Sequence, residues 1–140
     1  FERERAIERE SLLLRLIMLE LHQAEDPTTF IPLPREPRCR AAANLVLAAP
    51  MINHDIADLA RQVGTSTRTL SRLFASETHL SFKAWTQRAR IASAIERWAL
   101  DPHRSIKQTA AEMGYNSFPA FCHAFRQVTG KTPKEFVGER

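Results

Sequence analysis

The chain carries one pattern of residues twice, and this duplication constrains its fold more than any other feature. GTSTRTLSRLF begins at Gly64, and GYNSFPAFCHAF begins at Gly114. An offset of 50 residues aligns the two copies up to the glycine, and an offset of 51 aligns them beyond it. The aligned pairs include Ile56 with Ile106, Ala60 with Ala110, Ser66 with Ser117, Leu70 with Phe121 and Phe74 with Phe125. Each copy is interpreted as a short helix, a glycine turn and a second helix, which is the helix-turn-helix pattern. The one-residue change of offset falls in the turn, where an inserted residue is tolerated best.

Helix signals follow one another along most of the chain. Caps and turns predict helices over 38–49, 56–63, 67–78, 82–100, 106–113 and 118–129, and a short last helix from Pro133. The predicted N-caps are Asp55, Ser66, Ser81, Ser105, Ser117 and Thr132, the last in a capping box with Glu135. Helix 67–78 ends at His79, where its repeat has Gly130, and a left-handed residue is expected at both positions. Since no period-two alternation of β-branched residues occurs, the sequence predicts an all-α fold.

The region before the first copy is organised differently. A helix is predicted over 2–22, and its apolar side chains require a partner, which is an upstream domain, a second subunit or the rest of this chain. One face of that helix carries Ile7, Leu14, Ile17 and Leu21. Because the chain begins with Phe1 rather than Met, we expect it to be part of a longer protein. A stiff, extended linker is predicted next, from Pro27, Pro32, Pro34 and Pro37.

The predicted organisation therefore has five parts. Residues 1–25 form an amphipathic helix from an upstream region or a dimerisation element, and 26–37 form the Pro-rich linker. Two helix-turn-helix subdomains, 38–81 and 102–140, are joined by a linker helix over 82–101. Helix 82–100 is about 28 Å long, close to the ~34 Å between successive major grooves on one face of DNA. One side of it is expected to pack against both subdomains through Phe82, Trp85, Ala89, Ala92, Ile95 and Ala99.

Charge is distributed unevenly along the chain. The net charge is +4, to which residues 1–50 contribute −1 and residues 51–140 contribute +5. A basic half suggests an anionic partner such as nucleic acid or a membrane surface. No apolar run reaches the ~18–20 residues that span a bilayer. Because Cys39, Cys122 and the five histidines match no metal or redox spacing, we expect reduced thiols, no metal, no cofactor and a cytoplasmic location.

The second helix of each copy retains an apolar face and changes the opposite one. That opposite face carries Arg68, Ser71, Arg72 and Ala75 in the first copy, and Pro119, Cys122, His123 and Arg126 in the second. Both sets follow i, i+3, i+4, i+7 spacing and so lie on one side of a helix. The pattern is typical of two versions of a DNA-reading surface, although two stacked hairpins with solvated outer faces would give the same buried pattern.

Three stretches of the sequence resemble a known family. They are DIADLARQVGTSTRTLSRLF, FKAWTQRARIASA and SIKQTAAEMGYNSFPAFCHAFRQVTGKTPKEF. The chain from about Arg38 to Arg140 resembles the DNA-binding domain of the AraC/XylS family of bacterial transcription regulators. The resemblance implies two helix-turn-helix units joined by a long helix, sequence-specific binding of double-stranded DNA and, in most members, an upstream sensor domain.

The same resemblance implies roles for individual residues. Base-reading positions fall on Arg68, Ser71 and Arg72 in the first unit, and on Phe118, Pro119, Cys122 and His123 in the second. Arginine can bind guanine through two hydrogen bonds, whereas the second set can touch a thymine methyl group but cannot form such a pair, so we expect the first unit to dominate base readout. Phosphate contacts are expected from Ser66, Thr69, Lys83, Arg90, Ser117, Arg126 and Lys131. The expected partners are double-stranded DNA, RNA polymerase and a second copy bound through residues 2–22 or an upstream domain, and no membrane.

A second interpretation stays open from the sequence. A helical protein-interaction module could keep this fold without binding DNA; the apolar second face favours it, whereas Arg68, Arg72 and the basic second half oppose it. An enzyme has little support, because the sequence offers no Ser-His-Asp set, glycine-rich phosphate loop or metal cluster. We therefore expect a binding protein and no catalytic activity.

Overall fold

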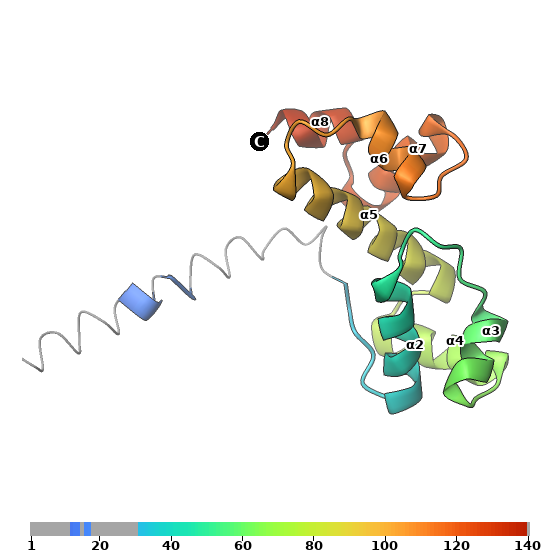
Figure 1. Ribbon diagram of the computed structural model, residues 1–140. Coiled ribbons are helices and arrows are strands. Elements are labelled where there is room, and N and C mark those ends of the chain that lie inside the picture. The colour runs from blue at the N-terminus through green and yellow to red at the C-terminus, as the bar shows by residue number, and fades with distance from the viewer. Residues whose placement is uncertain (1–11, 15, 18–30, 140) are drawn as a thin grey trace, which may run out of the picture. The chain divides into compact units, whose positions relative to one another are not determined.

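A computed structural model describes residues 12–14, 16–17 and 31–139 of the chain (Figure 1). The chain divides into two compact parts, Phe1–Phe30 and Ile31–Arg140. In the N-terminal part, residues 12–14 and 16–17 are helical and their apolar side chains are exposed. The remainder of the helix predicted over 2–22 and residues 26–30 of the predicted linker lie outside the described residues.

The part from Ile31 to Arg140 consists of helices joined by turns and loops, and no strand occurs within 31–139. In chain order the helices are α2 (Pro37–Ala48), α3 (Ile56–Val63), α4 (Thr67–Thr78), α5 (Phe82–Leu100), α6 (Ile106–Glu112), α7 (Phe118–Thr129) and α8 (Pro133–Gly138). The predicted all-α class is confirmed, and the predicted bounds of α3, α4, α5 and α7 agree with those observed. α2 begins one residue earlier than predicted because Glu36 is its N-cap and accepts a hydrogen bond from the Cys39 N–H at 2.7 Å.

Left-handed residues end the helices on both sides of the duplication. Gly64 follows α3 with φ 73°, His79 follows α4 with φ 58°, and Gly130 follows α7 with φ 76°. The prediction for His79 is thus confirmed. Because a side chain in this region costs about 1 kcal/mol, the first unit carries a strain that the second avoids. The predicted capping box of Thr132 and Glu135 is also present at the start of α8.

The first hydrophobic core joins α2, α3, α4 and the beginning of α5. Phe74 and Trp85 are fully buried, with ring centroids 5.2 Å apart. The segment before α2 packs here as well: Pro34 is buried, and Trp85 Nε1 donates a hydrogen bond to the Pro32 carbonyl oxygen at 2.7 Å. Residues 31–36 are therefore part of the folded unit, whereas the sequence predicts a linker there. The difference arises because a distant indole supplies both an apolar surface and a hydrogen-bond donor for this proline-rich segment.

The second hydrophobic core joins the later half of α5 with α6, α7 and α8. Phe121 and Phe125 are fully buried, and the Trp98 ring lies 6.2 Å and 5.7 Å from them between centroids. Trp98 Nε1 donates to Thr109 Oγ1 at 2.9 Å, so the polar end of the buried indole is satisfied. Each helix-turn-helix unit thus has a core of its own, and α5 contributes one tryptophan to each.

α5 buries two faces, which corrects the prediction of a single shared side. Trp85 belongs to the first core, whereas Ile91 and Trp98 belong to the second. At about 100° per residue, Trp85 and Trp98 point in directions about 140° apart around the helix. Of the residues predicted to share one side, Ala92 is half-buried and Ala99 is exposed. The two groups of helices attach at opposite ends of α5 (Figure 1), so no single apolar stripe has to serve both.

Candidate nucleic-acid interface

The outward face of α4 is basic. Arg68, Ser71 and Arg72 are exposed, while Leu70 and Phe74 on the other side of the helix are fully buried. The caps explain this placement: Gly64 turns the chain and Ser66 starts the helix, so the register of the buried residues sets the register of the exposed ones. The structure therefore brings the three predicted base-reading residues of the first unit together on one exposed helix face.

Glu77 is the acidic residue of α4, and it does not face the same way as the arginines. Its carboxylate accepts hydrogen bonds from the backbone N–H groups of Arg35 and Glu36, each at 3.1 Å. These groups belong to the segment that precedes α2 and packs on the first core. Within the fully described α4, the outward face accordingly carries positive charge without an acidic neighbour.

The predicted phosphate contacts at helix starts act in this structure as caps. Ser66 Oγ accepts from the Thr69 N–H at 3.1 Å and donates to Thr69 Oγ1 at 2.9 Å. Ser117 Oγ accepts from the Ala120 N–H at 3.2 Å. Because the Ser66 O–H is donated to Thr69 Oγ1, a phosphate at the start of α4 would meet the backbone N–H groups of the first turn and the Thr69 hydroxyl.

The outward face of α7 is mostly apolar. Phe118, Pro119 and His123 are exposed, whereas Cys122 is half-buried. Lys107 lies with its Nζ 5.8 Å from the centroid of the Phe118 ring, a cation–π geometry. The four predicted positions of the second unit thus lie on one helix face, but none of them offers the two parallel donors that an arginine has.

A hollow of about 550 Å³ borders this second face. Its floor is apolar, and Lys107 and Lys134 stand among its lining residues. The full lining consists of Ser105, Ile106, Lys107, Phe118, Cys122, Thr132, Pro133 and Lys134. Sequence reasoning missed this hollow because its walls come from the first residues of α6 and α8, which only the packed structure brings beside α7.

The charged candidates for phosphate binding differ in their surroundings. Lys83 and Arg126 are exposed. Lys131 forms an ion pair with Glu139. Arg90 is turned inward instead: its Nε donates to the Pro50 carbonyl oxygen at 3.0 Å, and one terminal nitrogen donates to the Ile52 carbonyl oxygen at 3.1 Å. A guanidinium held by two backbone oxygens is poorly placed to reach DNA, so we do not include Arg90 in the candidate interface.

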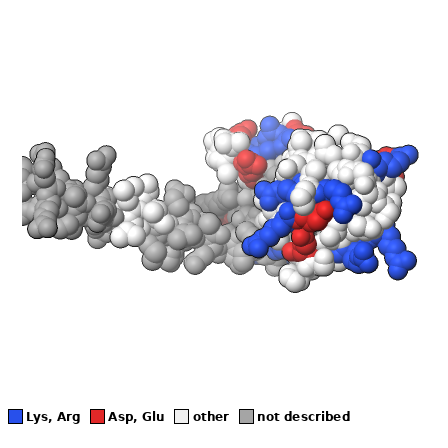
Figure 2. Space-filling model, turned by 90° about the horizontal axis from the view of Figure 1, so that it is seen from below, with Lys and Arg blue, Asp and Glu red and all other residues white. Residues whose placement is uncertain are grey.

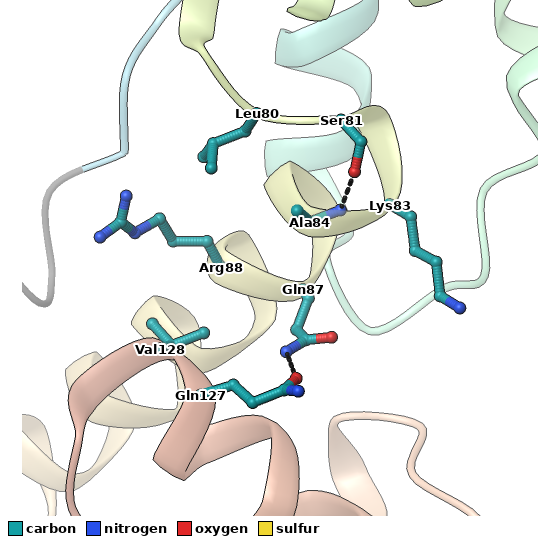
Figure 3. A pocket seen from close by; sticks show the side chains of 8 residues that line it. All are labelled: Leu80, Ser81, Lys83, Ala84, Gln87, Arg88, Gln127 and Val128. Carbon is teal, nitrogen blue, oxygen red and sulfur yellow. Dashed lines mark hydrogen bonds between the residues drawn. The ribbon is translucent and has the colours of Figure 1, made fainter.

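A second hollow, of about 340 Å³, lies between the beginning of α5 and the end of α7 (Figure 3). Gln87 Nε2 donates to Gln127 Oε1 at 3.0 Å across it. Lys83 and Arg88 both contribute to its lining, but Figure 3 shows their side chains extending in different directions. Because no charges converge on this hollow, we interpret it as a gap between packed elements rather than as a ligand site.

The charge of the described part is positive but not gathered on every side. Residues 31–139 contain fifteen Lys and Arg and nine Asp and Glu. On the face drawn in Figure 2, basic side chains are spread over the folded part and lie beside acidic ones. Uniform positive charge is therefore a local property of helix faces such as that of α4.

Burial raises the pKa of the Cys39 thiol to about 12, so this thiol stays protonated at neutral pH.

No three His, Cys, Asp or Glu side chains in the described part of the chain gather closely enough to hold a metal ion. Among the helices of residues 31–139, none combines the length and apolar character of a membrane span.

Comparison with known proteins places this architecture. A family described as "Helix-turn-helix domain" matches residues 59–139. The HTH-type transcriptional regulator RipA of Corynebacterium glutamicum is 34% identical over 111 residues, which cover 79% of this chain and 32% of that protein. The HTH-type transcriptional regulator NimR of Escherichia coli is 26% identical over 125 residues, which cover 89% of this chain and 45% of that protein. The chain thus spans less than half the length of these curated relatives.

A solved structure supports the same placement. The crystal structure of a transcriptional regulator with an AraC-type DNA-binding domain from Chromobacterium violaceum superposes with a TM-score of 0.68 at 26% identity, over 74% of this chain and 92% of that one. Two helix-turn-helix units on one connecting helix define a class of double-headed helix-turn-helix domains. Within that class, this chain belongs to the AraC/XylS family, as its family match and its relatives show.

Proposed function

We propose that this chain is the DNA-binding part of a transcription regulator and that it binds double-stranded DNA in a sequence-specific manner. The observation that carries the proposal is the exposed pair Arg68 and Arg72 on the second helix of a helix-turn-helix unit, on a face without acidic side chains. Arginines at such positions can reach guanine O6 and N7 in the major groove.

Both recognition helices, α4 and α7, are proposed to enter successive major grooves. α5 has 19 residues and is therefore about 28 Å long, and each unit is anchored to it by a separate core. A single chain with two such units can contact two grooves without a second subunit. Base readout is assigned mainly to Arg68, Ser71 and Arg72, because each arginine offers two parallel N–H donors to a base edge.

The second unit is proposed to supply an apolar contact to a base and contacts to the DNA sugar–phosphate backbone. Phe118, Pro119, Cys122 and His123 form its reading face, which suits a thymine methyl group better than a guanine edge. Phosphate contacts are assigned to Lys83, Arg126 and Lys131, and to the helix starts capped by Ser66, Thr69 and Ser117.

Selection of bound sites from a random duplex pool tests this proposal directly. We expect a recovered consensus with guanine at positions contacted by the first unit, and an affinity that falls about 10³-fold between 50 and 200 mM salt if roughly six phosphates are contacted. Failure to enrich any sequence, together with no binding to random duplex at 50 mM salt, would contradict the proposal. That result would favour the alternative, a protein-interaction module with this fold.

The longer protein is also a matter of proposal. Because the matched relatives extend well beyond this chain, we propose that a sensor domain accompanies the DNA-binding part in the complete regulator. Residues 1–25 are assigned to that region or to dimerisation, and 38–81, 82–101 and 102–140 to the two subdomains and their linker helix. RNA polymerase is a proposed partner, and the cytoplasm the proposed location, since transcription takes place there in bacteria.

A further inference from the structure

The loop between α2 and α3 belongs to the first unit by sequence but touches the second unit. Met51 packs against the second hydrophobic core. Its carbonyl oxygen lies so close to Gly114 that a Cβ atom built on that glycine would be 2.5 Å away. Gly114 and Tyr115 form the turn that leads into α7. The loop therefore rests directly on the turn that positions the second recognition helix.

Arg90 of α5 holds this loop in place. Its guanidinium donates to the carbonyl oxygens of Pro50 and Ile52, which flank Met51, and its Cζ lies 5.9 Å from the centroid of the Tyr115 ring. One side chain thus contacts the loop of the first unit and the turn of the second. Hydrogen bonds from a charged donor are among the stronger ones in proteins, and the planar guanidinium permits two of them in a fixed geometry.

We propose that Arg90 is a positioning residue for DNA recognition, because it sets the distance and angle between the recognition helices α4 and α7. Apart from this contact, the two units are related chiefly through their separate packing on α5, whose Gln87 also donates a hydrogen bond to Gln127 of α7. With it, the loop, the linker helix and the turn each contact the other two. The inference rests on the proposed function for its biological meaning, and it predicts that the chain reads two contact regions at one preferred spacing.

The first experiment needs no DNA. Residual dipolar couplings of backbone amides report whether two parts of a molecule move as one rigid body. We expect one alignment tensor to fit the amides of both units in the wild type, and two different tensors to be required in Arg90→Met. Retention of a single tensor in Arg90→Met would overturn the proposal, whatever the chain binds.

Gly114 provides a variant that breaks the same contact without removing a charge. In Gly114→Ala the new methyl group would collide with the Met51 carbonyl oxygen. Gly64→Ala is its matched control, because Gly64 has a similar φ (73° against 81°), occupies the equivalent turn of the first unit and has nothing within 4 Å of a built Cβ. We expect both variants to lose stability, but only Gly114→Ala to need two tensors. Equal behaviour of the two glycine variants would contradict the proposal.

The second experiment uses the duplex selected by the wild-type chain, with base pairs inserted between its two contact regions. One inserted base pair turns the second region by roughly 34° around the DNA axis. We expect the preference of the wild type for the selected spacing over this insertion to fall on the order of tenfold in Arg90→Met, as for loss of charge-assisted hydrogen bonds. Arg90→Lys keeps the charge but not the planar guanidinium, so its spacing preference should lie between those of the wild type and Arg90→Met. This variant replaces Arg90→Met in the test if Arg90→Met does not fold.

Lys83→Met is the charge-matched control, since Lys83 is exposed on the same helix. It should lower affinity at every spacing by a similar factor. If Arg90→Met also weakened binding equally at all spacings, Arg90 would be a phosphate ligand and the proposal would be wrong. Absence of DNA binding by the wild type would instead refute the proposed function, while the dipolar couplings would still decide the role of Arg90.

Discussion

The two helix-turn-helix units differ more on their surfaces than in their cores. Leu70 and Phe74 of the first unit and Phe121 and Phe125 of the second are all fully buried at equivalent positions. On the outer faces, by contrast, two arginines of α4 stand where α7 has a proline and a histidine. Because burial constrains one face of each helix and leaves the other free, a duplicated unit can keep its fold while its two copies acquire different chemistry.

The largest expected effect should be shared by the two units. Phe74→Ala and Phe125→Ala each remove a fully buried ring from equivalent positions. We expect each to lower the free energy of unfolding by about 3–5 kcal/mol, measured by urea denaturation. A loss below about 1 kcal/mol at either position would show that the core around it is not packed as described and that the two cores are not equivalent.

The next effect should separate the units. Arg72→Ala is expected to weaken binding to the selected site by about 1–3 kcal/mol and to relax the preference at one base pair. His123→Ala, at the equivalent position of α7, should cost less than about 1 kcal/mol because a single imidazole cannot form the bidentate pair. Titration of each variant against the selected and single-base-pair-changed duplexes measures both. Weakening by Arg72→Ala to the same extent on all sequences would instead identify a phosphate contact.

A smaller effect concerns the ends of the recognition helices. His79 has φ 58° where the second unit has Gly130 with φ 76°. We expect His79→Gly to raise the free energy of unfolding by about 1 kcal/mol and Gly130→Ala to lower it by a similar amount. Thermal denaturation of both variants measures the pair. A lower melting temperature for His79→Gly would mean that the imidazole makes a stabilising contact that outweighs the backbone strain.

The smallest effect tests the apolar face of α7. Replacing thymine by uracil in the region of the selected duplex that α7 contacts removes only a methyl group. We expect a loss of about 0.5–1 kcal/mol in binding, the size of one buried methyl group. The same replacement tested on Phe118→Ala should cost less, since the ring that meets the methyl group is gone. An identical loss in both proteins would show that Phe118 does not contact thymine.

Much of the fold could be predicted because its signals are local. Asp55, Ser66, Ser81 and Ser117 each accept a backbone N–H at the start of the helix for which they were predicted as N-caps. Such capping depends on residues two or three positions away, which a sequence shows directly. The rotation of the buried face along α5 was not predictable in this way, because it depends on where two separate cores attach.

The candidate site was predictable to a smaller degree. The exposed positions of Arg68, Ser71 and Arg72 follow from the helical period of their buried neighbours. The hollow beside Phe118 and the inward orientation of Arg90 do not, since their partners lie on other elements. A basic residue in an amphipathic helix gives no local sign of whether it will meet solvent, phosphate or a backbone carbonyl.

By itself, then, the amino-acid sequence determined the duplication, the bounds of the helices within residues 31–139 to within a residue, and the face that each recognition helix exposes. Tertiary structure alone decided that residues 31–36 join the first core, that α5 buries two faces, and that Arg90 clasps the loop of one unit against the turn of the other. The physical reason is range. Caps and helical periods act over a few residues, whereas Trp85 finds Pro32 across 53 positions and Arg90 finds Pro50 across 40.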